Sequence, residues 1–293
     1  MALSLNNFLE LSKPWEYDFK NEYPWDEDMP TQIDSISLFL KYKATQPGFD
    51  CDCCDLANEI YALLWECSPI SGRDRWSPRY SLGVMEDAVN SVVKSYSGEI
   101  LFDKKSLERE TMNSFKTTYD QAIKIEIKEH PNIRLRDYQN KFGWIDIQKF
   151  KNDHPDILEK VDANKELQKF ACLTHSIGNF TMLINPSLLN YEIGFNIGRY
   201  TPTKDYWDLS LDLLRKELGN DELYAAYIKA FCLEECVDAS YNAVPLFTRA
   251  TSPDMPKPQT SSELDEFLTN VNNRITARGK QIVSLLRELL KDK

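Results

Sequence analysis

The sequence predicts a mainly α-helical protein with a small mixed α+β centre and a long C-terminal helix. Apolar residues recur at helical spacing in several segments, a β-like apolar run follows His175, and a heptad pattern ends the chain. The 42% hydrophobic and 12% aromatic content is typical of a folded globular protein. At 293 residues the chain can bury a large core, as one generous domain or two modest ones.

The N-terminal segment 13–30 interleaves five aromatic residues with six acidic ones. From Trp15 to Phe19 apolar and acidic residues alternate with the period of two that characterises a half-buried strand. We expect a strand or an arm docked on the fold. The alternative is an extended arm that lays its aromatic side chains on a partner.

Beyond residue 33 the pattern becomes helical. Apolar stripes predict helices over residues 33–40, 56–64, 85–96 and 107–127, and shorter elements over 128–155. The turn Ser68–Pro78 places Arg73 and Arg75 beside Trp76. Such a loop could bind an anion or a partner, or be a packed loop with a surface ion pair.

Two further helices are expected over 206–218 and 222–236, separated by Gly219 and Asn220, which favour a helix stop and restart. Cys232 and Cys236 lie one helical turn apart in the second, where we expect them to pack as small apolar residues. The other cysteines include a close group at 51, 53 and 54, whose spacing does not suit tetrahedral zinc.

Three prolines at 253, 256 and 258 predict an extended linker before the final helix. The sequence therefore divides into a globular domain 1–250, a linker 251–260 and a helix 261–293, capped by Ser261 or Ser262. Arg278 is the one polar interruption of the heptad seam, which consists of Leu264, Leu268, Val271, Ile275, Ile282, Leu285 and Leu289. This helix either folds back on the core or forms an arm for homo-oligomerisation.

The net charge of the chain limits the kinds of partner that it can bind. A net charge of −11 disfavours direct binding to nucleic acid, and favours a protein partner with a basic surface, such as the DNA-binding face of another protein. No apolar run reaches membrane-spanning length, and the N-terminus lacks the basic region of a signal peptide. We therefore expect a cytoplasmic protein without a membrane contact.

The densest motif is the run from Thr174 to Leu183, T-H-S-I-G-N-F-T-M-L, which contains one of only three histidines. In a structural interpretation, Gly178 allows a close backbone approach, Asn179 forms a turn, and His175 is a hydrogen-bonded core residue. In a functional interpretation, His175 is a metal ligand or general base that Asn179 orients.

The run from His175 to Leu183, with Leu189 and Asn190, resembles the H-x-I-G-N-L-T-L-L…L-N segment of the nuclease-like domain of bacterial modification-dependent restriction proteins, a relative of the His-Asn-His endonucleases. The span 175–215 is also similar to uncharacterised bacterial proteins that share an H-[ST]-I-G core. Together these resemblances cover about a sixth of the chain.

The resemblance implies catalytic roles for His154, His175 and Asn179, and a divalent metal, Mg²⁺ or Mn²⁺, bound by Asp153 and His175. The chain departs from the family, because the upstream acidic-His-Ile-x-Pro element is shortened to Asp153-His154-Pro155. Glu129-His130-Pro131 repeats that local pattern, and both read equally well as helix starts. The basic residue that follows L-N in the family corresponds best to Lys204.

Two functions follow. The first is a non-catalytic, acidic, oligomeric inhibitor or regulator in the conflict between phages and bacteria, with a degenerate nuclease-like motif and no cofactor. Its partner would be a protein such as a nucleic-acid-acting defence enzyme. The alternative is a metal-dependent endonuclease of the His-Asn-His kind. Convergence of Asp153, His154 and His175 in one cleft would favour the alternative.

Overall fold

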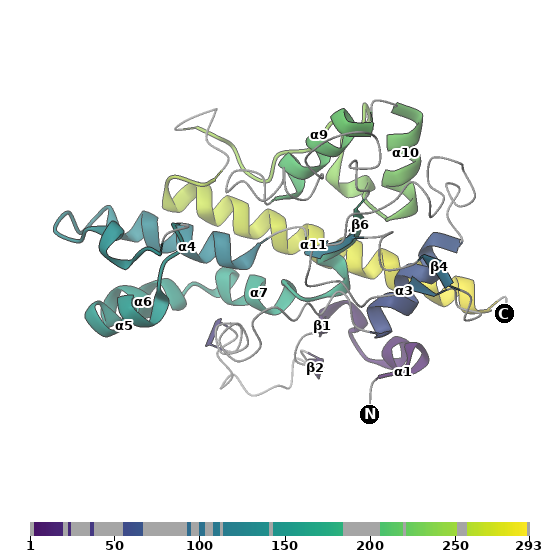
Figure 1. Cartoon of the computed structure of the whole chain (residues 1–293), viewed down its shortest axis with the longest axis horizontal. Helices are drawn as coiled ribbons and strands as arrows, with labels where there is room; N and C mark the ends of the chain where they lie inside the picture. Colours follow the sequence, from purple (N-terminus) through teal and green to yellow (C-terminus); the bar gives the residue numbers. More distant parts are fainter. Residues whose placement is uncertain are drawn as a thin grey trace.

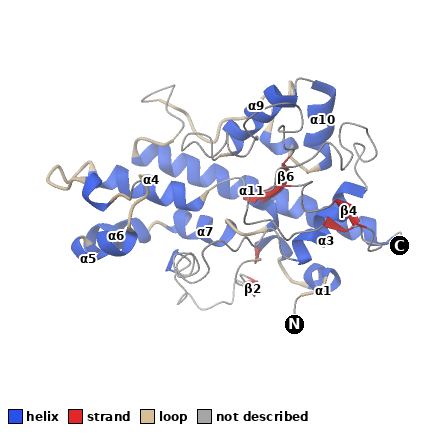
Figure 2. Ribbon diagram, in the orientation of Figure 1, coloured by secondary structure: helices blue, strands red, loops and turns tan. Residues whose placement is uncertain are grey.

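The computed structural model describes residues 3–19, 23–24, 36–37, 55–66, 93–94, 100–102, 108–111, 114–140, 143–183, 206–218, 221–250 and 257–291. These residues are mainly helical, and their strands form three separate two-stranded antiparallel pairs (Figure 2). The predicted mainly α class with a small β contribution is therefore confirmed.

The α-helices are α1 (Leu5–Glu10), α3 (Asp55–Glu66), α4 (Phe115–Ile127), α5 (Ile147–Asp153), α6 (Pro155–Asp162), α7 (Lys165–Leu173), α9 (Trp207–Leu218), α10 (Asp221–Ala230) and α11 (Ser261–Lys291). Short 3-10 helices are η1 (Pro14–Glu16), η6 (Leu135–Tyr138), η7 (Ile177–Asn179) and η9 (Glu234–Cys236). The strand pairs are β1 (Tyr17–Asp18) with β2 (Tyr23–Pro24), β3 (Val93–Lys94) with β4 (Ile100–Phe102), and β5 (Glu108–Thr111) with β6 (Phe180–Leu183).

Helix α11 is the centre of the fold. It runs along the long axis of the molecule, with α4 and α7 beside it and α9 and α10 on its other side (Figure 1). The seam residues Leu264, Leu268, Val271, Ile275 and Ile282 are buried against the chain itself. Of the two alternatives for the final helix, the structure shows the one folded back on the core.

This position of α11 bears on the predicted domains and assembly. The seam belongs to one hydrophobic core that also contains residues of α1, α4 and α7. The predicted regions 1–250 and 261–293 therefore contribute side chains to the same core. Homo-oligomerisation through α11 stays a prediction, but its seam is already occupied within the chain. Assembly that leaves this fold intact therefore has to use another surface.

The segment just before α11 is docked. The buried Pro258 accepts a hydrogen bond at its carbonyl from Gln121 Nε2 (2.7 Å), and the Gln259 carbonyl accepts one from Lys128 Nζ (2.6 Å). The described part of the predicted linker, residues 257–260, therefore contains no regular helix before α11 and is docked on α4 and on the residue that follows it. Residues 251–256 lie outside the described residues.

The cap of α11 also differs from the prediction. Thr260 Oγ1 accepts the backbone N–H of Glu263 (3.2 Å), and the Glu263 carboxylate reaches back to the N–H of Gln259 (2.7 Å). This is close to the reciprocal arrangement of a capping box. The predicted caps Ser261 and Ser262 are wrong, since both already lie inside the first helical turn.

The N-terminal segment is an arm docked on α11. Tyr17 and Phe19 are buried and make edge-to-face contacts with each other and with Phe8 and Phe180. Trp15 lies against Gly279 of α11, where an added Cβ would come within 2.9 Å of the Trp15 Cβ. Within the described residues the aromatic side chains therefore pack on the protein's own core, as expected for a docked arm.

Three predicted helices have different limits. The helix expected over 107–127 begins only at Phe115, because residues 108–111 form β5, whose pairing with β6 no local pattern reveals. The helix expected over 85–96 is wrong at 93–94, which form β3. The helix expected over 222–236 ends at Ala230, since Cys232 has a positive φ of 55°. The helices predicted over 56–64 and 206–218 are confirmed as α3 and α9.

Some predictions fall on segments that are not described. These are most of the helices 33–40 and 85–96, the Arg73–Trp76 loop, the cysteines 51, 53, 54 and 67, and Lys204. Among the described helices, none combines the length and the apolar composition needed to cross a bilayer.

The cap of α11 provides a test of this fold. Thr260→Ala removes the acceptor of the Glu263 N–H, so we expect the free energy of unfolding to fall by about 1 kcal/mol. The matched control is Ser261→Ala, which changes an exposed residue of the first turn and should shift stability by less than about 0.5 kcal/mol. Urea unfolding followed by circular dichroism measures both, and a larger effect at Ser261 would contradict this assignment.

Candidate functional site

The predicted site residues lie in two separate places. Asp153 ends α5 and His154 connects α5 to α6. His175 follows α7, and Asn179 is the last residue of η7. The helices α6 and α7 lie between the two pairs in sequence, and no contact between the pairs is found among the described residues.

The His175 motif is buried. Only 4% of His175 is exposed, and its backbone carbonyl accepts the N–H of Phe19 (3.0 Å). The Asn179 side chain is fully buried and donates from Nδ2 to the carbonyl of Thr174 (2.9 Å), while Ser176 Oγ donates to that of Leu173 (2.8 Å). These bonds fold the chain from the end of α7 into η7, so Asn179 holds the turn in which His175 lies.

Gly178 brings this turn into direct backbone contact with α11. A Cβ built at Gly178 would lie 2.0 Å from the carbonyl oxygen of Ile275, far inside van der Waals contact. Only glycine fits such an approach. The glycine of the motif is therefore explained by helix packing.

Arg278 of α11 completes this contact from the other side. Its guanidinium is 1% exposed and donates from Nη1 to the carbonyls of Gly178 (2.8 Å), Ile177 (3.4 Å) and Phe180. Nε donates to the carbonyl of Phe231, just beyond α10 (3.0 Å), and the guanidinium carbon lies 5.1 Å from the centre of the Trp207 ring. Arg278 thus ties η7, β6 and the end of α10 to α11.

The sequence shows Arg278 as the one polar residue of the heptad seam, but the groups that its charge binds were not predicted. The missed signal is a single arginine in an otherwise apolar heptad seam, because a buried charge requires several hydrogen-bond acceptors. The carbonyls at the end of a short helix are such acceptors, since they have no intrahelical donors. Its Nη2 has no hydrogen-bond partner among the described residues.

The second place is a polar cluster around Tyr138 of η6. The phenol donates to Asp153 Oδ2 (3.0 Å) and lies 2.9 Å from His154 Nε2. The Tyr138 hydroxyl has one proton, which it donates to Asp153. In the bond between Tyr138 and His154, Nε2 of His154 is therefore the donor, which leaves Nδ1 as the basic nitrogen of the ring. Partial desolvation and the bond to Asp153 raise the pKa of Tyr138. This cluster has the groups for proton transfer, and it lies at a helix junction.

The predicted metal site is not assembled by the described residues. No group of three or more histidine, cysteine, aspartate or glutamate side chains arranged to hold a metal ion is found among them. Asp153 and His175, the predicted ligands, share no contact there. A divalent ion at this protein therefore stays a prediction.

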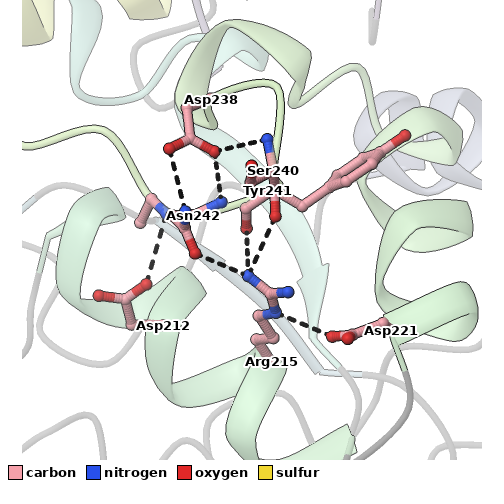
Figure 3. A network of polar contacts seen from close by, with 8 residues as sticks. Asp212, Arg215, Asp221, Asp238, Ser240, Tyr241 and Asn242 are labelled. Carbon is pink, nitrogen blue, oxygen red and sulfur yellow. Dashed lines mark hydrogen bonds and ion pairs between the residues drawn. The ribbon is translucent and has the colours of Figure 1, made fainter.

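A third network joins α9 to the irregular chain after η9. Arg215 donates to Asp221 Oδ1 (2.9 Å) and to two carbonyls and the Asn242 side chain (Figure 3). Asp238 accepts the backbone N–H groups of Ser240 (2.8 Å) and Asn242 (2.9 Å) and the Asn242 amide (3.0 Å). The Asn242 bonds lower the pKa of Asp238, and the bond to Asp221 raises that of Arg215. Arg215 Nη1 and Asp238 both bind the loop at 240–242, so the network has a structural role.

The two cysteines near Arg278 are buried thiols. Burial raises the pKa of Cys232 and of Cys236 to about 11, although the positive charge of Arg278 acts in the opposite direction. A thiol with such a pKa is almost entirely protonated at neutral pH and is a poor nucleophile. The expectation that both pack as apolar residues agrees with their burial.

Comparisons of the chain with protein-family models, with curated proteins and with solved structures found no match. The resemblance of the His175 motif to the nuclease-like restriction domain therefore stays a prediction.

The close contact of Gly178 with α11 predicts that a side chain at this position would lower the stability of the protein. Gly178→Ala places a methyl group against the Ile275 carbonyl, and we expect the free energy of unfolding to fall by about 3 kcal/mol. Gly143→Ala is the control, because Gly143 has open space around it and only a positive φ of 81°, which costs about 1 kcal/mol. Equal losses in urea unfolding would contradict the close approach.

Alkylation tests the burial of the cysteines. At pH 8 iodoacetamide should modify Cys232 and Cys236 in the folded protein about 100-fold more slowly than in the protein unfolded in guanidinium, because the pKa rises from 9.0 to about 11. The rate should increase about tenfold per pH unit up to pH 11. Peptide mass spectrometry follows each thiol separately, and equal rates in the two states would show that the thiols are accessible.

Proposed function

We propose that this protein acts by binding another protein, as a non-catalytic, acidic inhibitor or regulator in the conflict between phages and bacteria. One observation supports this above the alternative. The residues that resemble a nuclease motif form the docking turn of α11, where Gly178 meets the helix backbone and Asn179 and Arg278 hold the turn. The motif has a structural role that requires no reaction.

The partner proposed is a protein with a basic surface, such as the nucleic-acid-binding face of a defence enzyme. The net charge of −11 would accelerate encounter with such a face and repel DNA itself. The defence context comes only from the resemblance. We further propose that the protein works as a homo-oligomer, through a surface other than the buried seam of α11.

The alternative, a metal-dependent endonuclease, is favoured by the Tyr138 cluster. His154 Nδ1 could accept a proton from water, and Asp153 offers the oxygen ligands that Mg²⁺ and Mn²⁺ prefer. A bound divalent ion would stabilise the charge that develops on the phosphate. In this form the site would use Asp153 and His154 without His175.

Cleavage of DNA and RNA with Mg²⁺ or Mn²⁺ separates the two functions. We expect no divalent-dependent cleavage by wild-type protein or by His154→Ala, and we expect His175→Ala to lower stability because the residue is buried. His130→Ala is the matched control, since His130 also precedes a proline. Cleavage that is lost in His154→Ala and kept in His130→Ala would establish the nuclease instead.

The binding function is tested with the immobilised protein in bacterial and phage-infected lysates. We expect a basic nucleic-acid-acting protein to be retained at low salt and released as salt rises, because screening weakens attraction between opposite charges. The activity of the purified partner should fall when this protein is added. Retention that does not depend on salt, with no effect on the partner's activity, would contradict the proposal.

A further inference from the structure

Trp144 is the one large hydrophobic residue that the described part of the chain leaves exposed, with 36% of its surface accessible. It lies between η6 and α5, in the segment that projects at one end of the molecule beyond α4 (Figure 1). Tryptophan is enriched among the residues that dominate protein interfaces. An exposed indole at a projecting end is therefore a candidate contact.

The backbone holds this tryptophan in a fixed turn. Asn140 donates its N–H to the Trp144 carbonyl (2.9 Å) and accepts the Trp144 N–H at Oδ1 (3.1 Å). Gly143 adopts a positive φ of 81° and donates to the Asn140 carbonyl (2.9 Å), and its own carbonyl accepts Gln139 Nε2 (2.9 Å). A tryptophan whose backbone is held this way has less conformational freedom to lose on binding, which favours affinity.

An ion pair between the buried Asp120 and the half-buried Lys116 anchors the turn to α4. Asp120 is 2% exposed, pairs with Lys116 and accepts the N–H of Ile145 at Oδ2 (3.3 Å). The Lys116 ammonium lies 5.5 Å from the centre of the Trp144 ring, a cation–π distance. Burial raises the pKa of Asp120 and lowers that of Lys116, so the pair is held at an electrostatic cost.

The surroundings of the turn differ in charge from the rest of the chain. Residues 133–153 contain five lysines and arginines and three aspartates, a net charge of +2. Since the whole chain carries −11, the remainder carries −13. The exposed cations in this segment include Arg134, Arg136, Lys149 and Lys151.

Exposed acidic residues lie at α10 and in the chain just after it, toward the other end of the molecule (Figure 1). They are Asp221 and Glu222 in α10, and Glu234, Glu235 and Asp238 after it. Asp221 also pairs with Arg215, and Asp238 also accepts hydrogen bonds within its own loop. We name these five residues the α10 face. A basic end with an exposed indole and an acidic face elsewhere on the same chain suit a head-to-tail contact between copies.

We propose that the Trp144 turn, with the cations of residues 133–153, docks onto the α10 face of a second copy of this chain. The contact joins two different surfaces, so a pair of copies keeps one free turn and one free face, and the assembly grows into a ring or an open chain. This inference rests on the oligomeric part of the proposed function. It is tested with the purified protein alone, so its failure would leave the lysate experiment unaffected.

Sedimentation velocity over a range of protein concentrations provides the first test. We expect wild-type protein to self-associate more weakly as salt rises, and Trp144→Ala to raise the dissociation constant by about tenfold or more. Glu234→Lys/Glu235→Lys should have a similar effect, and the charge control Lys165→Glu in α7 should have none. Circular dichroism checks that each variant is folded. Monomeric wild-type protein at every concentration would overturn the proposal.

Mixing the defective variants gives a sharper test. Trp144→Ala keeps an intact α10 face, and Glu234→Lys/Glu235→Lys keeps an intact turn, so their mixture should form dimers and no larger species. A mixture that stays monomeric would show that the two surfaces do not meet. Self-association that Trp144→Ala abolishes and the charge variant leaves unchanged would likewise overturn the α10 face as the receptor.

Discussion

The contact between Arg278 of α11 and the turn at η7 is the interaction on which the rest of the fold depends. A buried guanidinium is costly unless its donors are satisfied, and here backbone carbonyls of η7, β6 and the residue just beyond α10 accept the hydrogen bonds of Nε and Nη1. The same turn allows α11 to approach because Gly178 has no side chain, and its neighbour His175 accepts the N–H of Phe19 from the N-terminal arm. One cation therefore joins the beginning, the middle and the end of the chain.

The parts of this fold that could be predicted from sequence are those set by local periodicity. The stripes of α3 and α9 and the seam of α11 are each read from spacing within one segment, and each occurs where expected. Strand β5 could not be predicted, because its partner β6 lies about seventy residues further along the chain. The motif at His175 stands out in the sequence by its density, but its packing against α11 depends on Arg278, about one hundred residues away.

The irregular segment from Val237 to Ala250 shows the same limit. It has almost no regular structure of its own, and side chains of two helices hold it in place. Arg274 donates to the carbonyls of Val244 (2.6 Å) and Pro245 (2.9 Å), and Asp208 accepts Arg249 Nη2 (2.8 Å). These donors and acceptors satisfy backbone groups that a strand or helix would otherwise satisfy. Sequence composition predicts a loop here but cannot identify partners that α9 and α11 contribute.

Two buried or partly buried cations, Arg278 and Lys116, have different roles, one in maintaining the fold and the other beneath an exposed turn. Arg278 is buried where three segments meet, so its cost is offset by the packing it organises. The Lys116–Asp120 pair, in which Asp120 is buried and Lys116 half-buried, lies beneath a surface turn. Packing alone does not require it, because apolar residues of similar volume often replace a buried ion pair without loss of stability. What the pair adds is a fixed position for Ile145 and, through it, for the exposed Trp144. Polar groups in this core therefore specify geometry, at the centre for the packing of α11 and at the projecting end for the position of Trp144.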